Sequence, residues 1–365
     1  GNYTGACATF QYNLKLGISM IQSGESLISF VGAAESGIVP EIYEAFAATR
    51  GLAEDKNLIR LQEQLGEDCE MPNHRRICRP FGENIGMILG ESAQFVVLMQ
   101  DSLALELGLN IHGAALSSHI HSDGYKKSIS GPGAGNYLTV GKIFNEIKKH
   151  FSSDALNKTF FHAHGTSTPQ NRESESHIIS SISKAFGIKA LPVTAIKSYL
   201  GHSLAAAGGD QMISALGSWK NNIIPGITST PELAENVHKE NVEFLLQNKK
   251  FKDGEFDFAV LNAKGFGGNN GTSLVASPSK TMKMLESKYS KKDIQAYLIK
   301  KQKIDDQLNQ RKQEILQGDT KSRYIFGENV IDGMNDFAIE TDKITNKFNK
   351  EIFDLNSTLP YKDYL

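Results

Sequence analysis

The chain has 365 residues, of which 40% are hydrophobic and 22% charged, and its formal net charge is −2. No apolar run is long enough to cross a bilayer, so we expect a globular chain with a large core and not a membrane protein. The small net charge gives no general reason to bind nucleic acid. Three cysteines, an odd number, favour a reducing, cytoplasmic compartment over a disulfide framework.

Short apolar runs alternate with helical periodicities up to about residue 278, which is typical of an α/β fold. The apolar runs predict strands at 26–34, 95–99, 159–164, 191–197, 256–265 and 272–277. Helical spacing predicts helices near 10–22, 101–108, 139–150, 174–186 and 203–219. Beyond residue 278, a stretch rich in Lys, Gln and acidic residues predicts a long amphipathic helix over 289–317 that lies on the body, followed by a less regular tail.

A cysteine stands directly before the first expected helix, in the stretch GNYTGACATF. Cys7 would lie at a strand-to-helix junction, where the partial positive charge and unpaired N–H groups of a helix N-terminus favour the nucleophilic thiolate. Buried cysteine is also among the commonest core residues. On position alone, an inert core cysteine is therefore the commoner explanation.

Two further stretches place histidines near the ends of expected strands. In FHAHGTSTPQNRESE, His162 and His164 occupy alternate positions, so both point to one face if the strand persists. In KSYLGHSLAAAGG, an expected strand ends at Lys197, and His202 precedes a helix start that would favour a neutral imidazole. A turn cap or a tight strand-to-helix junction would explain either stretch without catalysis.

The fourth stretch, LNAKGFGGNNGTSLV, places glycines on both sides of Phe266 between two expected strands. It lacks the glycine and lysine spacing of a phosphate-binding P-loop, and no helix follows it. Glycine lets a backbone come close to another group. We therefore interpret this stretch as a backbone that must approach a substrate.

Together these stretches resemble the β-ketoacyl synthases, the thiolase-fold condensing enzymes of fatty acid and polyketide synthesis. ACAT, HGTSTP, K-S-x-x-G-H followed by small residues, and GFGG occur in that family's order within residues 1–278. The stretch RPFGENIGMILGES at 79–92 is also similar, with GES where GEG or GEA is usual. HGTSTPQNRESESHI, KSYLGHSLAAAGGDQ, KSISGPGAGNYLT and NAKGFGGNN resemble the acetoacetyl-ACP synthase subgroup, which starts bacterial fatty acid synthesis.

The resemblance implies a layered αβαβα thiolase-like fold. Residues 1–150 would be the remainder of an N-terminal half that carries the nucleophile, 151–278 a C-terminal half that carries the histidines, and 279–365 a helical extension. Family members place the nucleophile near mid-chain. We therefore expect the N-terminal part of the fold to be missing here, supplied by another chain or lost, and the strand at 26–34 to expose a broad apolar edge. A homodimer is also implied.

The resemblance further implies an acyltransferase that condenses malonyl-ACP with an acyl primer, acetyl-CoA or an acyl-ACP, without a metal or another cofactor. Cys7 would carry the acyl group. His164 and His202 would donate hydrogen bonds to the enolate oxygen. Lys197 matches the lysine that organises the network near the first histidine, and Glu175 matches the glutamate eleven residues after that histidine.

The substrate-binding residues are expected around the glycine-rich stretch and the HGTST turn. Phe266 corresponds to the gating phenylalanine, and its N–H would form an oxyanion hole with that of Cys7. The other residues expected there are Gly265, Gly267, Thr166 and Thr168. One departure is Asn171-Arg172, where many members have Asn-Asp, so a positive charge could alter the network around the glutamate.

Other functions have weaker support in the sequence. Degradative thiolases would use a second cysteine near the C-terminus, but all three cysteines precede residue 79. A non-catalytic partner subunit of a synthase heterodimer typically lacks the nucleophile, which is present here. An elongating or polyketide-type ketosynthase remains an alternative.

The stretch CEMPNHRRIC offers a possible metal site. Cys69, His74 and Cys78 could supply three zinc ligands, but their spacing is not standard and no fourth ligand is obvious. The arginines of the same region could contact an acidic carrier protein, although a solvated basic loop is the commoner explanation. They are Arg75, Arg76 and Arg79.

Overall fold

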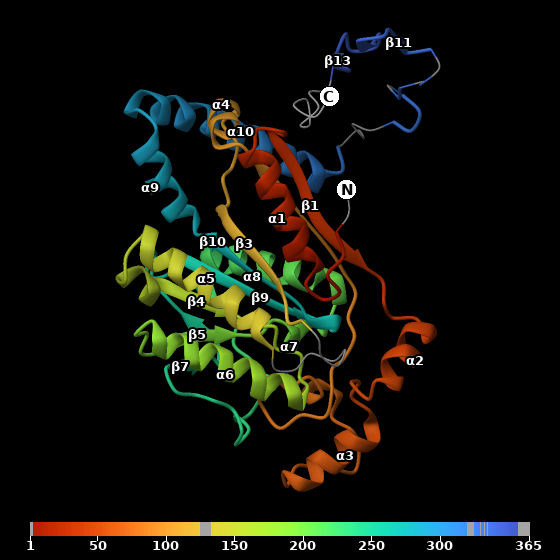
Figure 1. Ribbon diagram of the computed structural model, residues 1–365, viewed down its shortest axis with the longest axis vertical. Coiled ribbons are helices and arrows are strands. Elements are labelled where there is room, and N and C mark those ends of the chain that lie inside the picture. The colour runs from red at the N-terminus through yellow and green to blue at the C-terminus, as the bar shows by residue number, and fades with distance from the viewer. Residues whose placement is uncertain are drawn as a thin grey trace, which may run out of the picture. The chain divides into compact units, whose positions relative to one another are not determined.

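The computed structural model describes residues 3–124, 133–319, 325–328, 330–331, 333 and 335–356 (Figure 1). The chain divides into two compact units, Gly1–Asp305 and Asp306–Leu365, which we describe separately. Part of the stretch KSISGPGAGNYLT, residues 127–132, and the end of the tail, residues 357–365, lie outside the described residues. The three expected segments, 1–150, 151–278 and 279–365, remain a prediction.

A six-stranded mixed sheet forms the centre of the first unit. Its first three strands pair antiparallel, and the remaining pairs are parallel. In spatial order the strands are β3 (Ala114–Ser122), β10 (Asn269–Ala276), β9 (Phe258–Gly265), β4 (Thr159–His162), β5 (Leu191–Thr194) and β7 (Val242–Phe244).

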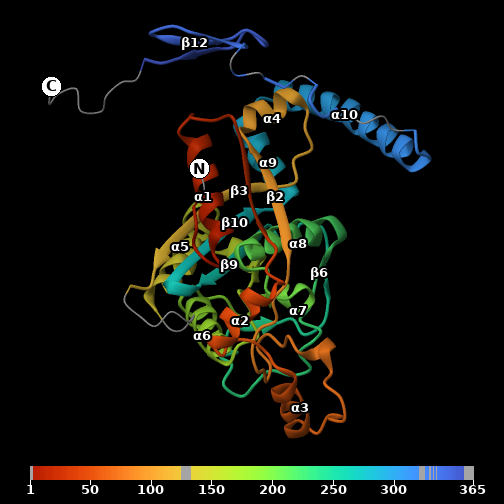
Figure 2. The same cartoon turned by 90° about the vertical axis from the view of Figure 1, so that its right-hand side faces the viewer.

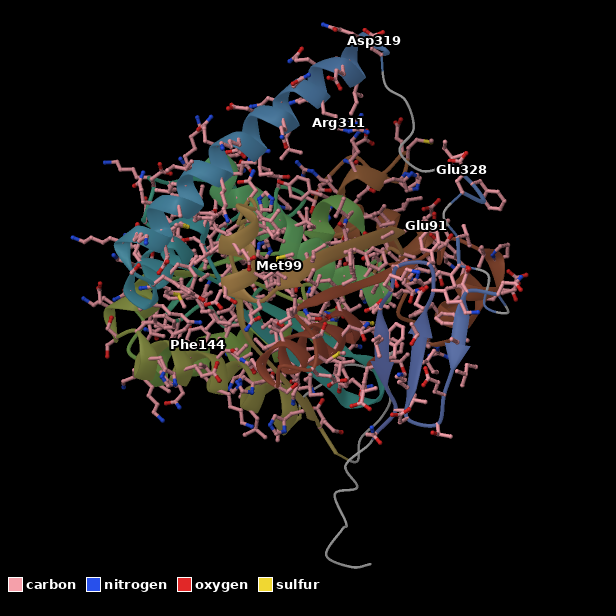
Figure 3. The ribbon with its side chains drawn as sticks, turned by 90° about the horizontal axis from the view of Figure 1, so that it is seen from above. Glu91, Met99, Phe144, Arg311, Asp319 and Glu328 are labelled. Carbon is pink, nitrogen blue, oxygen red and sulfur yellow. The ribbon has the colours of Figure 1, made fainter. Side chains whose placement is uncertain are left out.

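Both faces of this sheet are buried, because neighbouring residues of each strand point to opposite sides. Phe161 and Val260 face one core, which includes apolar side chains of α5 (Ala134–His150) and α6 (Pro169–Ala185). Phe160 and Leu261 face a second core, formed with α1 (Thr9–Gln22) and α8 (Ala207–Asn221). Side chains fill the space between the layers, as around Phe144 of α5 in Figure 3.

A two-stranded antiparallel ribbon, β1 (Ile28–Glu35) and β2 (Ser92–Met99), packs on the other side of α1 and α8. The described residues thus form helix, sheet, helix and sheet layers, which can be followed in Figures 1 and 2. The far face of the ribbon carries exposed apolar side chains: Phe30 is 78% exposed and Phe95 61%. The sequence predicted an exposed apolar edge here, whereas these exposed apolar side chains lie on a face of the ribbon.

Three further helices pack at one end of the unit, α4 (Asp101–Leu107), α9 (Pro278–Lys288) and the start of α10 (Lys291–Gln317). Ile294 and Tyr297 of α10 are buried against Leu105 and Leu285, so the first turns of this helix lie on the body as expected. None of the helices in the described part of the chain is long and apolar enough to span a bilayer.

Several elements differ from the sequence-based expectations. The structure adds β3, α2 (Pro40–Ala48) and α3 (Asp55–Gln64). The expected strand at 191–197 ends at Thr194, and Lys197 begins the short helix α7 (Lys197–Leu200). The expected helix at 203–219 is a 3₁₀ turn, Leu204–Ala206, followed by α8.

The second unit holds a small three-stranded antiparallel sheet. Its strands are β11 (Phe337–Ile339), β12 (Lys343–Asn346) and β13 (Ile352–Asp354). The tail is therefore more regular than the sequence predicted, because its short alternating runs are too brief for a period of two to stand out.

Candidate active site

Cys7 lies in a tight turn directly before α1 and is 4% exposed. The residue before it, Ala6, has φ +49°, a left-handed conformation that is unusual for a residue other than glycine. Thr9 braces this turn from both sides: its Oγ1 donates to Ala6 O at 2.7 Å and accepts from Gly5 N at 2.9 Å. The strained backbone of Ala6 and the hydrogen bonds of Thr9 thus hold the cysteine in place.

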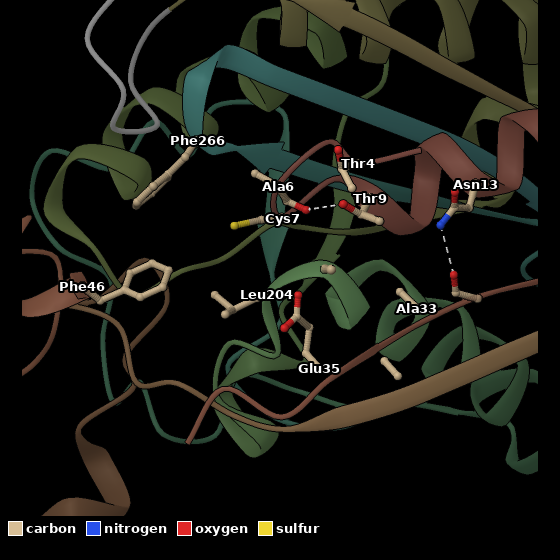
Figure 4. Close-up of a pocket in the computed structure, with 13 residues that line it drawn as sticks. Thr4, Ala6, Cys7, Thr9, Asn13, Ala33, Glu35, Phe46, Leu204 and Phe266 are labelled. Atoms are coloured by element: carbon tan, nitrogen blue, oxygen red, sulfur yellow. Dashed lines mark hydrogen bonds between the residues drawn. The ribbon is translucent and has the colours of Figure 1, made fainter. Parts of the chain in front are cut away.

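A cavity of about 380 Å³ opens beside the cysteine. Its wall includes Cys7, Glu35, Phe46, Leu204 and Phe266. In Figure 4 the sulfur of Cys7 points toward the space between the two phenylalanine rings, which pack at a centroid distance of 5.7 Å. The thiol therefore faces a mostly apolar cavity of a size suited to a small ligand group.

Burial raises the pKa of the Cys7 thiol to about 11. The charge of Lys197 and hydrogen bonding by the backbone N–H groups of Phe266 and Cys7 act in the opposite direction, without overcoming burial. The expectation that the helix start favours the thiolate is therefore wrong for the net effect, because desolvation of a buried sulfur penalises the charged form.

The glycine-rich stretch packs directly on the cysteine turn. A Cβ on Gly265 would lie 2.5 Å from Gly5 O and 3.2 Å from Cys7 N, so only glycine fits there. Gly267 has φ +76°, which suits glycine, and Asn269 Nδ2 donates to Phe266 O at 2.7 Å. The stretch therefore approaches another backbone, and the Phe266 N–H comes near enough to the thiol to act on its pKa.

His164 and His202 meet ring to ring, with a centroid distance of 5.4 Å and an interplanar angle of 88°. Both side chains are almost completely buried, and the Nδ1 of each ring has no hydrogen-bond partner. Burial first, and the charge of Lys197 second, hold the pKa of both imidazoles well below the usual value. His202 is thus neutral as expected, but burial and not a helix terminus is the main cause.

The backbone at His164 is held from two sides by buried charged groups. Lys197 Nζ donates to His164 O at 2.6 Å. Glu175 Oε1 accepts from His164 N at 2.6 Å, and its Oε2 accepts from Gly165 N at 2.9 Å. Burial lowers the pKa of Lys197, which is 3% exposed, while the nearby Cys7 and Glu175 act to raise it.

The threonines of the HGTST turn and Arg172 lie at the start of α6, close to His164 in the sequence. Thr166 and Thr168 pair through their hydroxyls at 3.2 Å, and Thr168 lies directly before α6. Arg172 points away from the glutamate: its guanidinium pairs with Glu83 at 2.8 Å and donates to Gly82 O. Its positive charge is therefore neutralised by another carboxylate.

Comparison with known proteins shows which family this chain resembles. Residues 113–230 match the model of the β-ketoacyl synthase C-terminal domain. The β-ketoacyl-[acyl-carrier-protein] synthase FabY of Pseudomonas aeruginosa is 44% identical over 333 residues, which is 91% of this chain and 52% of that protein. Over most of its length the chain resembles the β-ketoacyl synthases. The crystal structure of the noncanonical ketosynthase FabY from P. aeruginosa superposes with a TM-score of 0.90 at 40% identity, covering all of this chain and 56% of that one.

More distant β-ketoacyl synthases share the fold. A 3-oxoacyl-[acyl-carrier-protein] synthase 2 of Staphylococcus aureus is 26% identical over 273 residues, covering 73% of this chain and 60% of the relative. A type II PKS ketosynthase solved with its acyl-carrier protein matches with a TM-score of 0.64 at 20% identity, over 76% of this chain and 62% of that one. The chain thus spans between half and two thirds of the length of these proteins.

Not all sequence-predicted residues join the site. His162 is the last residue of β4, so the strand does not persist to His164, and its ring packs edge-on to Phe160 in the core. Both nitrogens of His162 are buried without a partner, and burial lowers its pKa to about 3. The two histidines therefore have different surroundings, which the alternate-position argument did not predict.

The possible zinc ligands and the arginines of the same loop lie in different surroundings. Cys69 is exposed, whereas Cys78 is buried and its thiol donates to Lys197 O at 3.2 Å. His74 pairs with Asp55 on the surface. Arg79 is 1% exposed and pairs with Glu67 at 2.7 Å, so neither a solvated arginine nor a carrier contact describes it.

Several residues that shape the site were missed from the sequence. Asn171 and Asn262 both donate to Glu175, at 2.9 and 2.8 Å, and fill the remaining acceptor sites of its carboxylate. Phe46 and Leu204 also line the cavity; Phe46 lies far from the quoted motifs, whereas Leu204 stands within KSYLGHSLAAAGG. The asparagines stand inside HGTSTPQN and LNAKG, so the motifs held a signal for them, whereas Phe46 had none.

Proposed function

We propose that this chain carries the condensing site of a β-ketoacyl-ACP synthase, which joins malonyl-ACP to an acyl primer with loss of carbon dioxide. The observation that carries the proposal is the position of Cys7: its thiol faces the cavity, and the backbone N–H groups of Phe266 and of Cys7 itself lie near enough to lower its pKa. Donors at that point suit an oxyanion on a carbonyl bonded to the sulfur.

In the first half-reaction, Cys7 Sγ attacks the carbonyl carbon of the primer thioester. The tetrahedral oxyanion is stabilised by the two backbone N–H groups, and the bond to the departing thiol then breaks, with the proton of Cys7 ending on that thiol. Because the pKa of Cys7 is about 11, the resting group is the neutral thiol. Acylation therefore includes loss of this proton when the primer binds, assisted by the charge of Lys197.

In the second half-reaction, the carboxylate of malonyl-ACP leaves as carbon dioxide, and its bonding electrons form an enolate. A neutral imidazole can donate one N–H to the enolate oxygen. His164 and His202 are kept neutral by burial, and their unpartnered Nδ1 atoms favour keeping the proton on Nε2, which avoids a buried N–H without an acceptor. The enolate carbon attacks the acyl-Cys7, the carbon–sulfur bond breaks, and the thiolate takes up a proton.

Other residues around the site hold the histidine and the cysteine in place. Lys197 and Glu175 fix the His164 backbone, and Phe266 with Phe46 closes the cavity over the sulfur. The acyl carrier protein enters as a partner because the names of the two curated relatives include it. Acetyl-CoA as the primer and a homodimer are proposed from the sequence resemblance.

The test is a condensation assay with malonyl-ACP that compares acetyl-CoA with longer acyl-ACP primers. We expect a β-ketoacyl-ACP product with the unaltered protein and none with Cys7→Ala. Cys69→Ala is the matched control, because Cys69 is exposed and lies outside the site. Product formation that survives Cys7→Ala would refute the nucleophile, and a preference for long primers would favour an elongating enzyme over one that starts synthesis.

A further inference from the structure

The first turn of α8 buries a carboxylate that the proposed reaction does not use. Asp210 is 4% exposed and accepts hydrogen bonds from three uncharged side chains. Ser92 Oγ donates at 2.6 Å and Gln94 Nε2 at 3.1 Å, both from β2. The third donor is the hydroxyl of Ser203, the residue next to His202. A buried carboxylate with three such donors is a rigid junction between the ribbon and the site.

The turn that Ser203 begins is strained. Leu204 has φ +48°, which a side chain larger than glycine rarely adopts, and it lines the cavity at Cys7. Such a conformation persists only where the surroundings hold it. Ser203 O accepts from Ala206 N at 3.0 Å, and the Ser203 hydroxyl bonds Asp210, so this residue anchors the turn at both its backbone and its side chain.

The His202 ring depends on this backbone for its orientation. Its Nδ1 has no partner, so no hydrogen bond at that atom fixes the ring. The backbone is held at both ends of the residue: His202 N donates to Ile88 O at 2.7 Å, and Gly90 N donates to His202 O at 3.0 Å. The Ser203–Asp210 bond is the next restraint along the chain, and it is the only one of the three made by a side chain.

We propose that Asp210 is a positioning residue that acts through Ser203 to hold His202 in its place opposite His164. This rests on the proposed function, in which His202 donates to the enolate oxygen. Ser92 and Gln94 hold the carboxylate toward the turn. The hydrogen bond from Ser92 to Asp210 gives a physical role to the serine of GES, because glycine or alanine at position 92 would offer Asp210 no hydroxyl.

The test separates the two half-reactions. Ser203→Ala removes the link to the turn and leaves Asp210 its two donors from β2. Ser218→Ala is the matched control, because Ser218 is 2% exposed, lies on the same helix as Asp210 and donates to Ser214 O at 2.9 Å. The rate of carbon dioxide release from malonyl-ACP and the rate of Cys7 acylation are measured for each variant.

For Ser203→Ala we expect carbon dioxide release to fall about tenfold or more, since a small misplacement of a catalytic group has effects of this order. Acylation should change less than about threefold, and Ser218→Ala should change neither rate. An unchanged release of carbon dioxide, or an equal fall in both rates, would overturn the proposal, because a merely structural role would not separate them.

A second measurement does not depend on activity. In protein labelled with ¹³C-histidine, the His202 ring signals should shift in Ser203→Ala and stay in place in Ser218→Ala. Unshifted signals in Ser203→Ala would overturn the positioning role. If the unaltered protein neither becomes acylated nor releases carbon dioxide, the proposed function fails, and the ring signals then decide the positioning of His202 alone.

Discussion

Lys197 and Glu175 both bond the backbone of His164: the lysine donates to His164 O at 2.6 Å, and the glutamate accepts from His164 N at 2.6 Å. Both side chains are at least 97% buried, with exposures of 3% and 0%. Neither reaches the cavity wall, so their contribution is to the placement of the histidine and to the local charge balance. A buried carboxylate of this kind is costly to alter, because its donors would lose their acceptor.

Glu175→Gln should therefore destabilise the fold and impair the second half-reaction. An amide cannot accept from all four donors that face the carboxylate, so we expect a loss of about 1–3 kcal/mol in the free energy of unfolding, measured by urea denaturation. Glu173→Gln is the matched control on the same helix, where the exposed side chain should change the free energy by less than about 0.5 kcal/mol. Equal effects of the two substitutions would contradict the assigned role of Glu175.

Alkylation of Cys7 should accelerate steeply with pH. Below the pKa the thiolate fraction grows about tenfold per pH unit, so with a pKa of about 11 the rate with iodoacetamide should still be rising at about pH 9.5. Mass mapping of the Cys7 peptide over time gives the rate. Lys197→Met removes a charge that lowers this pKa, so the rise should move to higher pH. A plateau below about pH 8.5 would show that burial does not control the thiol.

Acidification should weaken the fold through the buried histidines. Their pKa values are lowered in the folded chain, so below the ordinary value near 6.5 the unfolded chain binds more protons and stability is lost as the pH falls. His162→Phe removes one such group beside Phe160. We expect the dependence of the unfolding free energy on pH, between about pH 6 and 4.5, to become shallower by about 1.4 kcal/mol per unit. An unchanged slope would contradict the burial of a neutral His162.

Gly265→Ala should damage the site more than the fold. The added Cβ would press on Gly5 O and on the backbone of Cys7, so the two backbones must separate and the Phe266 N–H would leave the sulfur. We expect acylation of Cys7 to fall about a hundredfold. Gly141→Ala, in a helix where nothing lies within 4 Å, should instead stabilise the fold by about 0.5–1 kcal/mol. Normal acylation in Gly265→Ala would contradict the close approach.

The sequence predicted the core strands, and its motifs named side chains that the structure brings together near Cys7, because these features are local. Continuous apolar runs marked β4, β9 and β10, and the four motifs carried the cysteine, the histidines and the lysine. β3 was missed because its serines and histidines do not form a continuous apolar run. The hydroxyl of Ser118 in this strand donates to Gln11 O in the interior, a contact that the sequence does not reveal. The residues that depend on distant contacts, such as Phe46 against Phe266, left no local pattern.

The pKa of Cys7 also depends on distant contacts that the local sequence does not reveal. Its place before a helix suggested a favoured thiolate, which is a local argument. Burial beside the glycine-rich stretch, Phe46 and Leu204 is a tertiary effect, and it outweighs the local one. The Asp210 junction is another case, because its partners Ser92 and Ser203 lie far apart in the sequence.

The most direct measurement of the central claim is the mass of the Cys7 peptide during the two half-reactions. After incubation with the acyl primer, this peptide should gain one acyl group through the sulfur. On addition of malonyl-ACP the acyl group should disappear from Cys7 and appear in a β-ketoacyl-ACP product. A β-ketoacyl product formed while Cys7 stays unmodified and blocked by iodoacetamide would contradict the assignment of Cys7 as the acyl-accepting nucleophile.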